Sequence, residues 1–117
     1  MMKILFIDDE EINVELFKIN FSIDFEVLTG CSGLEGLELL NQNPETKVIL
    51  TDLKMPGMNG IEFIKKAKEK FPNKTYFIVT GFGLTEEIQD AIESGLIHRY
   101  FRKPFNIKEL KQAINEK

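Results

Sequence analysis

Short runs of apolar residues alternate along the chain with longer segments that carry apolar residues at helical spacing. The five runs are Ile4–Ile7, Phe25–Leu28, Val48–Leu50, Tyr76–Val79 and Tyr100–Phe101. The first, third and fourth runs are continuously apolar, without alternating polar residues, which is typical of strands buried on both faces. The pattern therefore predicts five short strands.

The segments between these runs predict amphipathic helices, because their apolar residues recur at spacings of three and four. The sets are Ile12, Leu16 and Ile19; Ile64, Ala67 and Phe71; Ile88, Ala91 and Ile92; and Ile107, Leu110 and Ile114. Helix starts are indicated where Ser32, Asn59 and Asn106 each precede a glutamate by three residues, the spacing of a capping box. Thr85 precedes two glutamates, which also favour a helix start.

Strict alternation of strands and helices with short connections predicts an α/β fold, a (βα)5 doubly wound sheet of five parallel strands with helices on both faces. With 117 residues, of which 43% are hydrophobic, the chain can form one domain over residues 1–117 with a single core.

Composition excludes several classes of protein. The net charge is −4 and no basic face is clustered, so we expect no nucleic-acid binding by this chain. No apolar run is long enough for a signal segment or a membrane span, so we expect a cytoplasmic protein without membrane contact. Cys31 is the only cysteine, which excludes an internal disulfide. We expect this thiol to be partly buried and structural.

Polar residues end four of the predicted strands, namely Asp8–Asp9, Thr51–Asp52, Thr80–Gly81 and Lys103–Pro104. Each alone has an ordinary interpretation as a helix cap, a turn residue or a surface charge. In an open parallel sheet, however, ligands bind outside the carboxyl ends of the strands. Three carboxylates, a hydroxyl and an ammonium are therefore expected at one edge.

Clustered carboxylates repel one another, so such a group needs a cation. Oxygen ligands without histidine or cysteine favour Mg2+ over zinc. Carboxylate-bound magnesium recruits phosphate oxygens, and an aspartate can accept a phosphoryl group as an aspartyl phosphate. The chemistry indicated is phosphoryl transfer by positioning and charge neutralisation.

Along essentially its whole length the sequence resembles response-regulator receiver domains. Four blocks carry the resemblance in the same order and spacing: Ile4–Glu10, Thr51–Gly60, Phe77–Gly81 and Tyr100–Phe105. The resemblance implies the flavodoxin-like receiver fold with strand order 2-1-3-4-5. It also implies a cis bond between Lys103 and Pro104, which proline makes accessible.

The resemblance implies a role for individual residues. Asp52 would be the phosphoacceptor, and Asp8 and Asp9 would bind Mg2+ together with Asp52 and the backbone carbonyl of Lys54. Thr80 and Lys103 would contact the phosphoryl group, to which Gly81 would add a backbone N–H. Tyr100 stands at the position of the switch aromatic, with a half-buried structural aromatic as the alternative.

The implied function is that of a phosphoacceptor in a two-component system or phosphorelay. The donor would be a sensor histidine kinase or a phosphotransfer protein, and the chain would catalyse only its own phosphorylation and dephosphorylation. The charge added at Asp52 would draw Thr80 inward, let Tyr100 rotate, and change the surface of the fourth helix, fifth strand and fifth helix. That surface could also mediate a homodimer.

Lys54 and Phe82 lie two residues after the acceptor and two after the threonine. We expect a long cation and a large ring there to obstruct an attacking water and to slow loss of the phosphoryl group. The alternative is that both side chains point away. His98 leads into the last strand, so we interpret it as a strand-edge or surface histidine and not as a relay histidine.

Three other functions are weaker alternatives. An aspartyl-nucleophile phosphohydrolase usually carries a second aspartate two residues after the nucleophile, where this chain has Lys54. A flavin-binding module needs a phosphate-cradling loop after the first strand, where Asp8 to Glu11 would repel phosphate. An adaptor that is never phosphorylated is a third alternative, and the complete acidic set with Thr80 and Lys103 argues against it.

Overall fold

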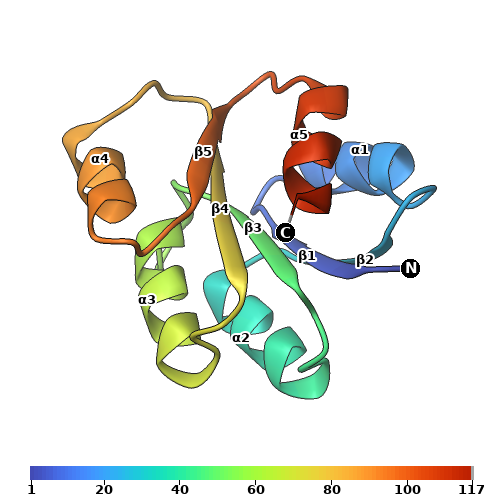
Figure 1. The fold of residues 1–117 in the computed structure, drawn as a ribbon, viewed down its shortest axis with the longest axis horizontal. Coiled ribbons are helices and arrows are strands. Elements are labelled where there is room, and N and C mark those ends of the chain that lie inside the picture. Colours follow the sequence, from blue (N-terminus) through green and yellow to red (C-terminus); the bar gives the residue numbers. More distant parts are fainter. Residues whose placement is uncertain (117) are drawn as a thin grey trace.

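Five strands and five helices alternate strictly in the computed structural model, which describes residues 1–116 (Figure 1). In chain order they are β1 (Lys3–Ile7), α1 (Glu11–Phe21), β2 (Glu26–Gly30), α2 (Gly33–Gln42), β3 (Val48–Asp52), α3 (Gly60–Lys70), β4 (Thr75–Thr80), α4 (Glu86–Glu93), β5 (Arg99–Arg102) and α5 (Ile107–Asn115). The predicted order of elements is therefore confirmed.

All neighbouring strands are parallel, and the sheet has the order β2-β1-β3-β4-β5. This confirms the predicted fold class and strand order. The register pairs Ile7 with Thr51 and Asp52 with Val79. The carboxyl ends of β1, β3 and β4 therefore finish side by side, because parallel strands in register end at the same edge of a sheet.

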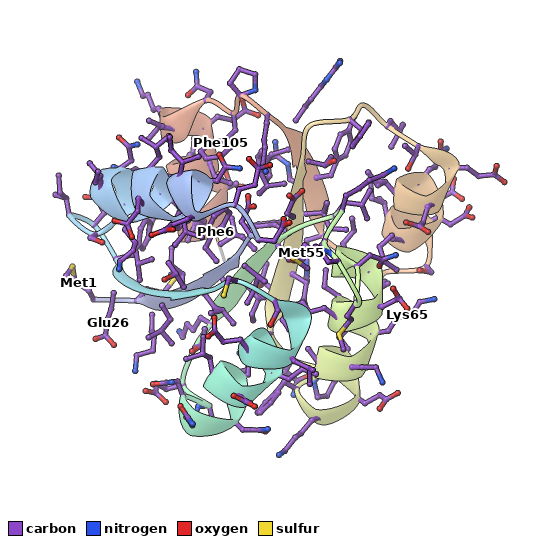
Figure 2. The ribbon with its side chains drawn as sticks, turned by 180° about the vertical axis from the view of Figure 1, so that it is seen from behind. Met1, Phe6, Glu26, Met55, Lys65 and Phe105 are labelled. Carbon is purple, nitrogen blue, oxygen red and sulfur yellow. The ribbon has the colours of Figure 1, made fainter. Side chains whose placement is uncertain are left out.

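The sheet separates two apolar cores. Helices α1 and α5 cover one face, and α2, α3 and α4 cover the other (Figure 1). In the core under α1 and α5, the rings of Phe6, Phe17 and Phe21 are stacked, with centroids 4.1 Å apart for each successive pair. Figure 2 shows Phe6 and Phe105 on the α1 side and Met55 on the opposite side. Strand β3 is buried along its whole length, as its uninterrupted apolar run predicts.

Short polar side chains cap the N-termini of four helices. The Ser32 hydroxyl accepts a hydrogen bond from the Glu35 N–H, and the Asn106 amide oxygen accepts one from the Glu109 N–H. Only Asn59 forms a complete capping box, in which the Glu62 carboxylate also accepts from the Asn59 N–H. The Thr85 hydroxyl accepts a hydrogen bond from the Ile88 N–H and so caps α4, without a reciprocal bond. The predicted starts are confirmed, whereas a reciprocal bond by the glutamate is seen at one of the three expected sites.

The exposed face of α1 differs from the expectation. Ile12, Leu16 and Ile19 were expected to form its buried face, but their exposed fractions are 68%, 52% and 67%. The helix buries Phe17 and Phe21 in their place. Both sets have helical spacing, and the larger aromatic rings remove more apolar area from water when they are buried.

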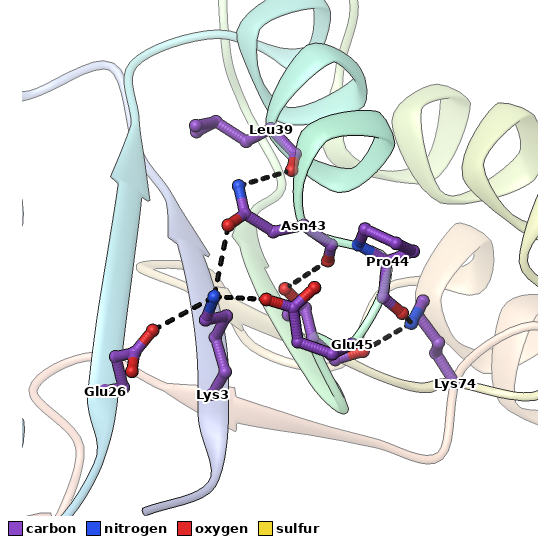
Figure 3. A network of polar contacts seen from close by, with 8 residues as sticks. Lys3, Glu26, Leu39, Asn43, Pro44, Glu45 and Lys74 are labelled. Carbon is purple, nitrogen blue, oxygen red and sulfur yellow. Dashed lines mark hydrogen bonds and ion pairs between the residues drawn. The ribbon is translucent and has the colours of Figure 1, made fainter.

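Lys3 ties together the end of the sheet opposite the predicted site (Figure 3). Its ammonium forms ion pairs with Glu26 and Glu45 and donates a hydrogen bond to the side chain of Asn43. These partners belong to β2 and to the connection between α2 and β3. The network therefore joins the amino-terminal ends of β1 and β2 to the connection that leads into β3, and β1 and β3 carry the site at their other ends.

Two further expectations concern single side chains. Cys31 is exposed, which contradicts the expected partial burial, because it lies in the connection between β2 and α2 and not in a core. His98 is exposed just before β5, and its Nδ1 accepts a hydrogen bond from the Tyr76 N–H. Within residues 1–116, no helix has the length and apolar character needed to cross a membrane.

Candidate phosphoryl-transfer site

Three carboxylates meet at the carboxyl edge of the sheet. One oxygen each from Asp8, Asp9 and Asp52 can be chosen so that all three lie within 4.8 Å of one another. Asp8 follows β1 directly and is fully buried, Asp52 ends β3 and is 7% exposed, and Asp9 is open to solvent. Such a group concentrates negative charge at a mouth that remains accessible to a ligand.

Lys103 supplies the positive charge that the structure places against this cluster. Its Nζ lies 2.8 Å from an Asp8 oxygen and 3.3 Å from an Asp52 oxygen. Burial alone would lower the pKa of Lys103, but the hydrogen bond to Asp8 and the charges of both carboxylates outweigh it and raise that pKa. Lys103 therefore stays protonated, and one cation faces three acids.

Burial raises the pKa of Asp52 above the usual range of an aspartate, and the charge of Asp8 acts in the same direction. The ammonium of Lys103 and the N–H of Leu53 favour the ionised form, but they do not cancel the burial effect. The carboxylate of Asp52 is therefore poorly compensated, which favours its reaction with, or binding to, a positively charged or electrophilic group.

Asp8 is held in place by its neighbours on α1. One oxygen accepts from the Glu10 N–H at 2.9 Å, and the other accepts from the Asn13 amide at 3.2 Å. Asn13 was missed by the sequence analysis. Its position in the first turn of a helix that starts directly after the acidic pair could have indicated it, because first-turn side chains point back toward the helix start. These two hydrogen bonds therefore fix the orientation of the Asp8 carboxylate.

The start of α3 fixes the backbone of Asp52. The Gly60 N–H donates to the Leu53 carbonyl at 2.8 Å, and a methyl group added at Gly60 would lie 2.2 Å from the Asp52 carbonyl oxygen. The Leu53 N–H donates to the Asp52 carboxylate at 2.8 Å. A residue without a side chain is therefore required where α3 meets the end of β3.

The remaining predicted residues come from β4 and β5. Thr80 is fully buried, and its hydroxyl accepts a hydrogen bond from the Phe82 N–H at 3.2 Å. Gly81 follows it, with open space where a side chain would begin. Tyr100 is partly buried against the α2–α4 core, and the bond between Lys103 and Pro104 is cis. The functional roles of these residues remain predictions.

Lys54 and Phe82 lie at the mouth of the site, on the loops that follow β3 and β4. Both side chains are exposed, and the Lys54 ammonium lies 4.7 Å from the centroid of the Phe82 ring. This distance is typical of a cation–π contact. The two side chains therefore contact each other, and their shielding of the site from an attacking water stays a prediction.

The donor set at this edge consists of oxygen atoms. Carboxylates of Asp8, Asp9 and Asp52 within 4.8 Å suit a hard cation that keeps some of its water, as Mg2+ does. No histidine or cysteine belongs to this group. The residues present therefore fit magnesium, whereas the contribution of the Lys54 carbonyl remains a prediction.

A family sequence model, related sequences and a solved structure all match this chain. The sequence model of the response regulator receiver domain matches residues 4–115. The chain is 31% identical over 115 residues to sporulation initiation phosphotransferase F of Bacillus subtilis, covering 97% of this chain and 91% of that protein. It is 33% identical over 119 residues to a chemotaxis protein CheY homolog of Campylobacter jejuni, covering 98% and 91%. The crystal structure of a response regulator receiver domain protein from Clostridium thermocellum has a TM-score of 0.89 at 34% identity, covering 99% and 93%. The chain therefore belongs to the response regulator receiver domain family.

Proposed function

We propose that this chain, as one domain over residues 1–117, accepts a phosphoryl group on Asp52 from a histidine kinase or phosphotransfer protein. The observation that carries the proposal is the pair of buried carboxylates of Asp8 and Asp52 with the partly buried Lys103, whose ammonium lies 2.8 Å and 3.3 Å from them. The similarity to a sporulation phosphotransferase and to chemotaxis proteins supports the same role.

The transfer follows from the charges present. A carboxylate oxygen of Asp52 attacks the phosphorus of a phosphohistidine, the phosphorus–nitrogen bond breaks, and its electron pair returns to the imidazole. Asp8, Asp9, Asp52 and the carbonyl of Lys54 would hold Mg2+, which when bound neutralises the charge on the phosphoryl oxygens. Lys103 then loses Asp52 as a carboxylate partner and pairs with a phosphoryl oxygen, while the Gly81 N–H donates to another.

Phosphorylation would act as a switch because it adds up to about two negative charges and three acceptor oxygens. The Thr80 hydroxyl would turn toward the phosphoryl group. Tyr100 would then move toward the vacated space, and the surface formed by α4, β5 and α5 would change shape. The same surface would serve if phosphorylation promotes a homodimer.

The exposed face of α1 is the docking surface we propose for the phosphodonor. Ile12, Leu16 and Ile19 of α1, with Ile23 just beyond its end, are 52–79% exposed and follow one another at spacings of three and four. Leu16 also borders an apolar groove of about 400 Å3 that reaches Lys103 and Pro104. An apolar surface this close to the acceptor fits a helical partner that must present its phosphohistidine to Asp52.

Chemical mapping of the acceptor tests the proposal. The protein is incubated with Mg2+ and a small-molecule phosphodonor and then treated with borohydride, which reduces an acyl phosphate to an alcohol. Peptide mass spectrometry is expected to find the reduced side chain at Asp52. Reduction at another residue, with Asp52 unchanged, would contradict the proposed acceptor.

A further inference from the structure

Two loops at the carboxyl edge of the sheet are connected by a contact between two side chains. Lys54 belongs to the connection between β3 and α3, and Phe82 belongs to the connection between β4 and α4. The Lys54 ammonium lies 4.7 Å from the Phe82 ring centroid, and the Phe82 ring is 51% exposed. We refer to this contact between Lys54 and Phe82 as the Lys54–Phe82 bridge.

The bridge continues through the backbone of Phe82 to the buried hydroxyl of Thr80. The Phe82 N–H donates to the Thr80 hydroxyl at 3.2 Å, and the Thr80 carbonyl accepts from the Lys103 N–H at 2.7 Å. The threonine carbonyl is thus held by the residue that follows β5, while its hydroxyl is held by the loop after β4. The loop in turn is restrained by the contact of its ring with Lys54.

We infer that the Lys54–Phe82 bridge is a latch that holds the Thr80 hydroxyl in the unphosphorylated arrangement. This inference rests on the proposed function. Turning the hydroxyl toward a phosphoryl group means a rotation about χ1 to another staggered position, which carries the oxygen away from the Phe82 N–H. The N–H must then find another partner, and the bridge resists the loop movement that would provide one. Lys54 and Phe82 are therefore positioning residues for Thr80.

The size of the effect follows from the exposure of the pair. A cation–π contact at an exposed site is worth about 0.5–1 kcal/mol, which corresponds to about a two- to fivefold change in an equilibrium constant. Loss of the bridge is therefore expected to favour the phosphoryl-bound arrangement by about two- to fivefold. A latch of this size biases the switch without preventing it.

A double-mutant cycle measures the latch directly. The probe is beryllofluoride with Mg2+, a noncovalent stand-in for the phosphoryl group, whose affinity is measured by NMR titration. Phe82→Leu removes the ring, keeps every charge and should bind about two- to fivefold more tightly. Lys54→Met removes the bridge, which should tighten beryllofluoride binding. It also removes a positive charge near the anionic probe, which should weaken that binding. The cycle separates them, because the change caused by Lys54→Met should differ by about two- to fivefold between the parent and the Phe82→Leu background.

Conservative and matched variants make the test specific. Lys54→Arg and Phe82→Tyr keep a cation over a ring and should bind like the parent. Lys70→Met removes an ammonium that lies 5.8 Å from the Phe71 ring, at the other end of α3, and should have no effect. In a Thr80→Ala background the coupling between Lys54 and Phe82 should disappear, which a merely structural contact would not do.

The outcomes separate this inference from the proposed function. Coupling that depends on Thr80 supports the latch. If the parent binds beryllofluoride but Lys54 and Phe82 show no coupling, or keep their coupling without Thr80, the latch is wrong and the proposed function stands. If the parent fails to bind beryllofluoride with Mg2+, the proposed function itself is wrong, and the latch with it.

Discussion

Replacing Asp52 by asparagine should make the magnesium-free protein more stable. The substitution keeps the size of the side chain, and the amide oxygen can still accept the hydrogen bond that Leu53 donates at 2.8 Å. Lys103 keeps its ion pair with Asp8 at 2.8 Å. The main change is the loss of one negative charge from a cluster of three.

The magnitude can be worked from the distances. At 4.8 Å, the separation that bounds the cluster, each repulsion between Asp52 and another carboxylate is about 0.9 kcal/mol in water and about 3.5 kcal/mol at an effective dielectric constant of 20. The attraction to Lys103 at 3.3 Å is about 1.3 and about 5 kcal/mol under the same two conditions. Two repulsions exceed one attraction, so Asp52→Asn should gain about 0.5–2 kcal/mol.

The gain should depend on pH and on magnesium. Because the folded-state pKa of Asp52 is raised, the folded protein keeps this proton as pH rises through the usual range of an aspartate, about 4, and loses it at higher pH. The advantage of Asp52→Asn is therefore absent in acid, grows with pH and is complete above the raised pKa. Saturating Mg2+ should reverse it, because a ligand at about 100 times its dissociation constant stabilises the parent by about 2.7 kcal/mol.

Urea denaturation of parent and variant, at low salt with a chelator and again with Mg2+, measures both effects. Asp90→Asn serves as the control, because it removes an exposed acid on α4 away from the cluster. An Asp52→Asn protein that is less stable than the parent without magnesium, or a difference unaffected by about 1 M salt, would refute the charge argument.

Three further predictions concern packing, phosphoryl lifetime and docking. Gly60→Ala should lose about 2 kcal/mol or more in urea denaturation, because its methyl group would lie 2.2 Å from the Asp52 carbonyl oxygen, whereas Gly81→Ala, with nothing within 4 Å, should change stability by less than about 0.5 kcal/mol. The double substitution Lys54→Asn and Phe82→Glu should shorten the phosphoryl lifetime after the donor is removed, and an unchanged lifetime would contradict shielding by these side chains. Leu16→Glu should slow transfer from a phosphodonor protein about tenfold without slowing phosphorylation by a small molecule, and equal slowing of both would contradict docking on α1.

Much of the fold could be predicted because its signals are local. The continuous apolar runs of β1, β3 and β4 predict buried strands, and the short polar residues before α2, α3 and α5 predict helix starts. Strand order came from the resemblance to receiver domains, which the structure and the comparisons bear out. Helix α1 shows the limit, since Ile12, Leu16 and Ile19 have the same spacing as a buried stripe but face solvent.

The site likewise has features that the sequence predicts and features that it does not. Residues at strand ends, such as Asp8 and Asp52, could be placed at one edge because a parallel sheet brings strand ends together. The Asn13 amide on Asp8 and the contact of Lys54 with Phe82 depend on side-chain directions and loop conformations. Those conformations are set by tertiary contacts that no local pattern encodes.

Phosphorylation of Asp52 is tested most directly by the intact mass of the protein after incubation with a small-molecule phosphodonor, with and without Mg2+, for the parent and for Asp52→Ala. We expect one phosphoryl adduct on the parent that requires Mg2+ and is absent from the variant. An adduct that persists in Asp52→Ala would contradict the assigned acceptor. A parent that gains no phosphoryl group under these conditions would contradict the proposed self-catalysed phosphorylation.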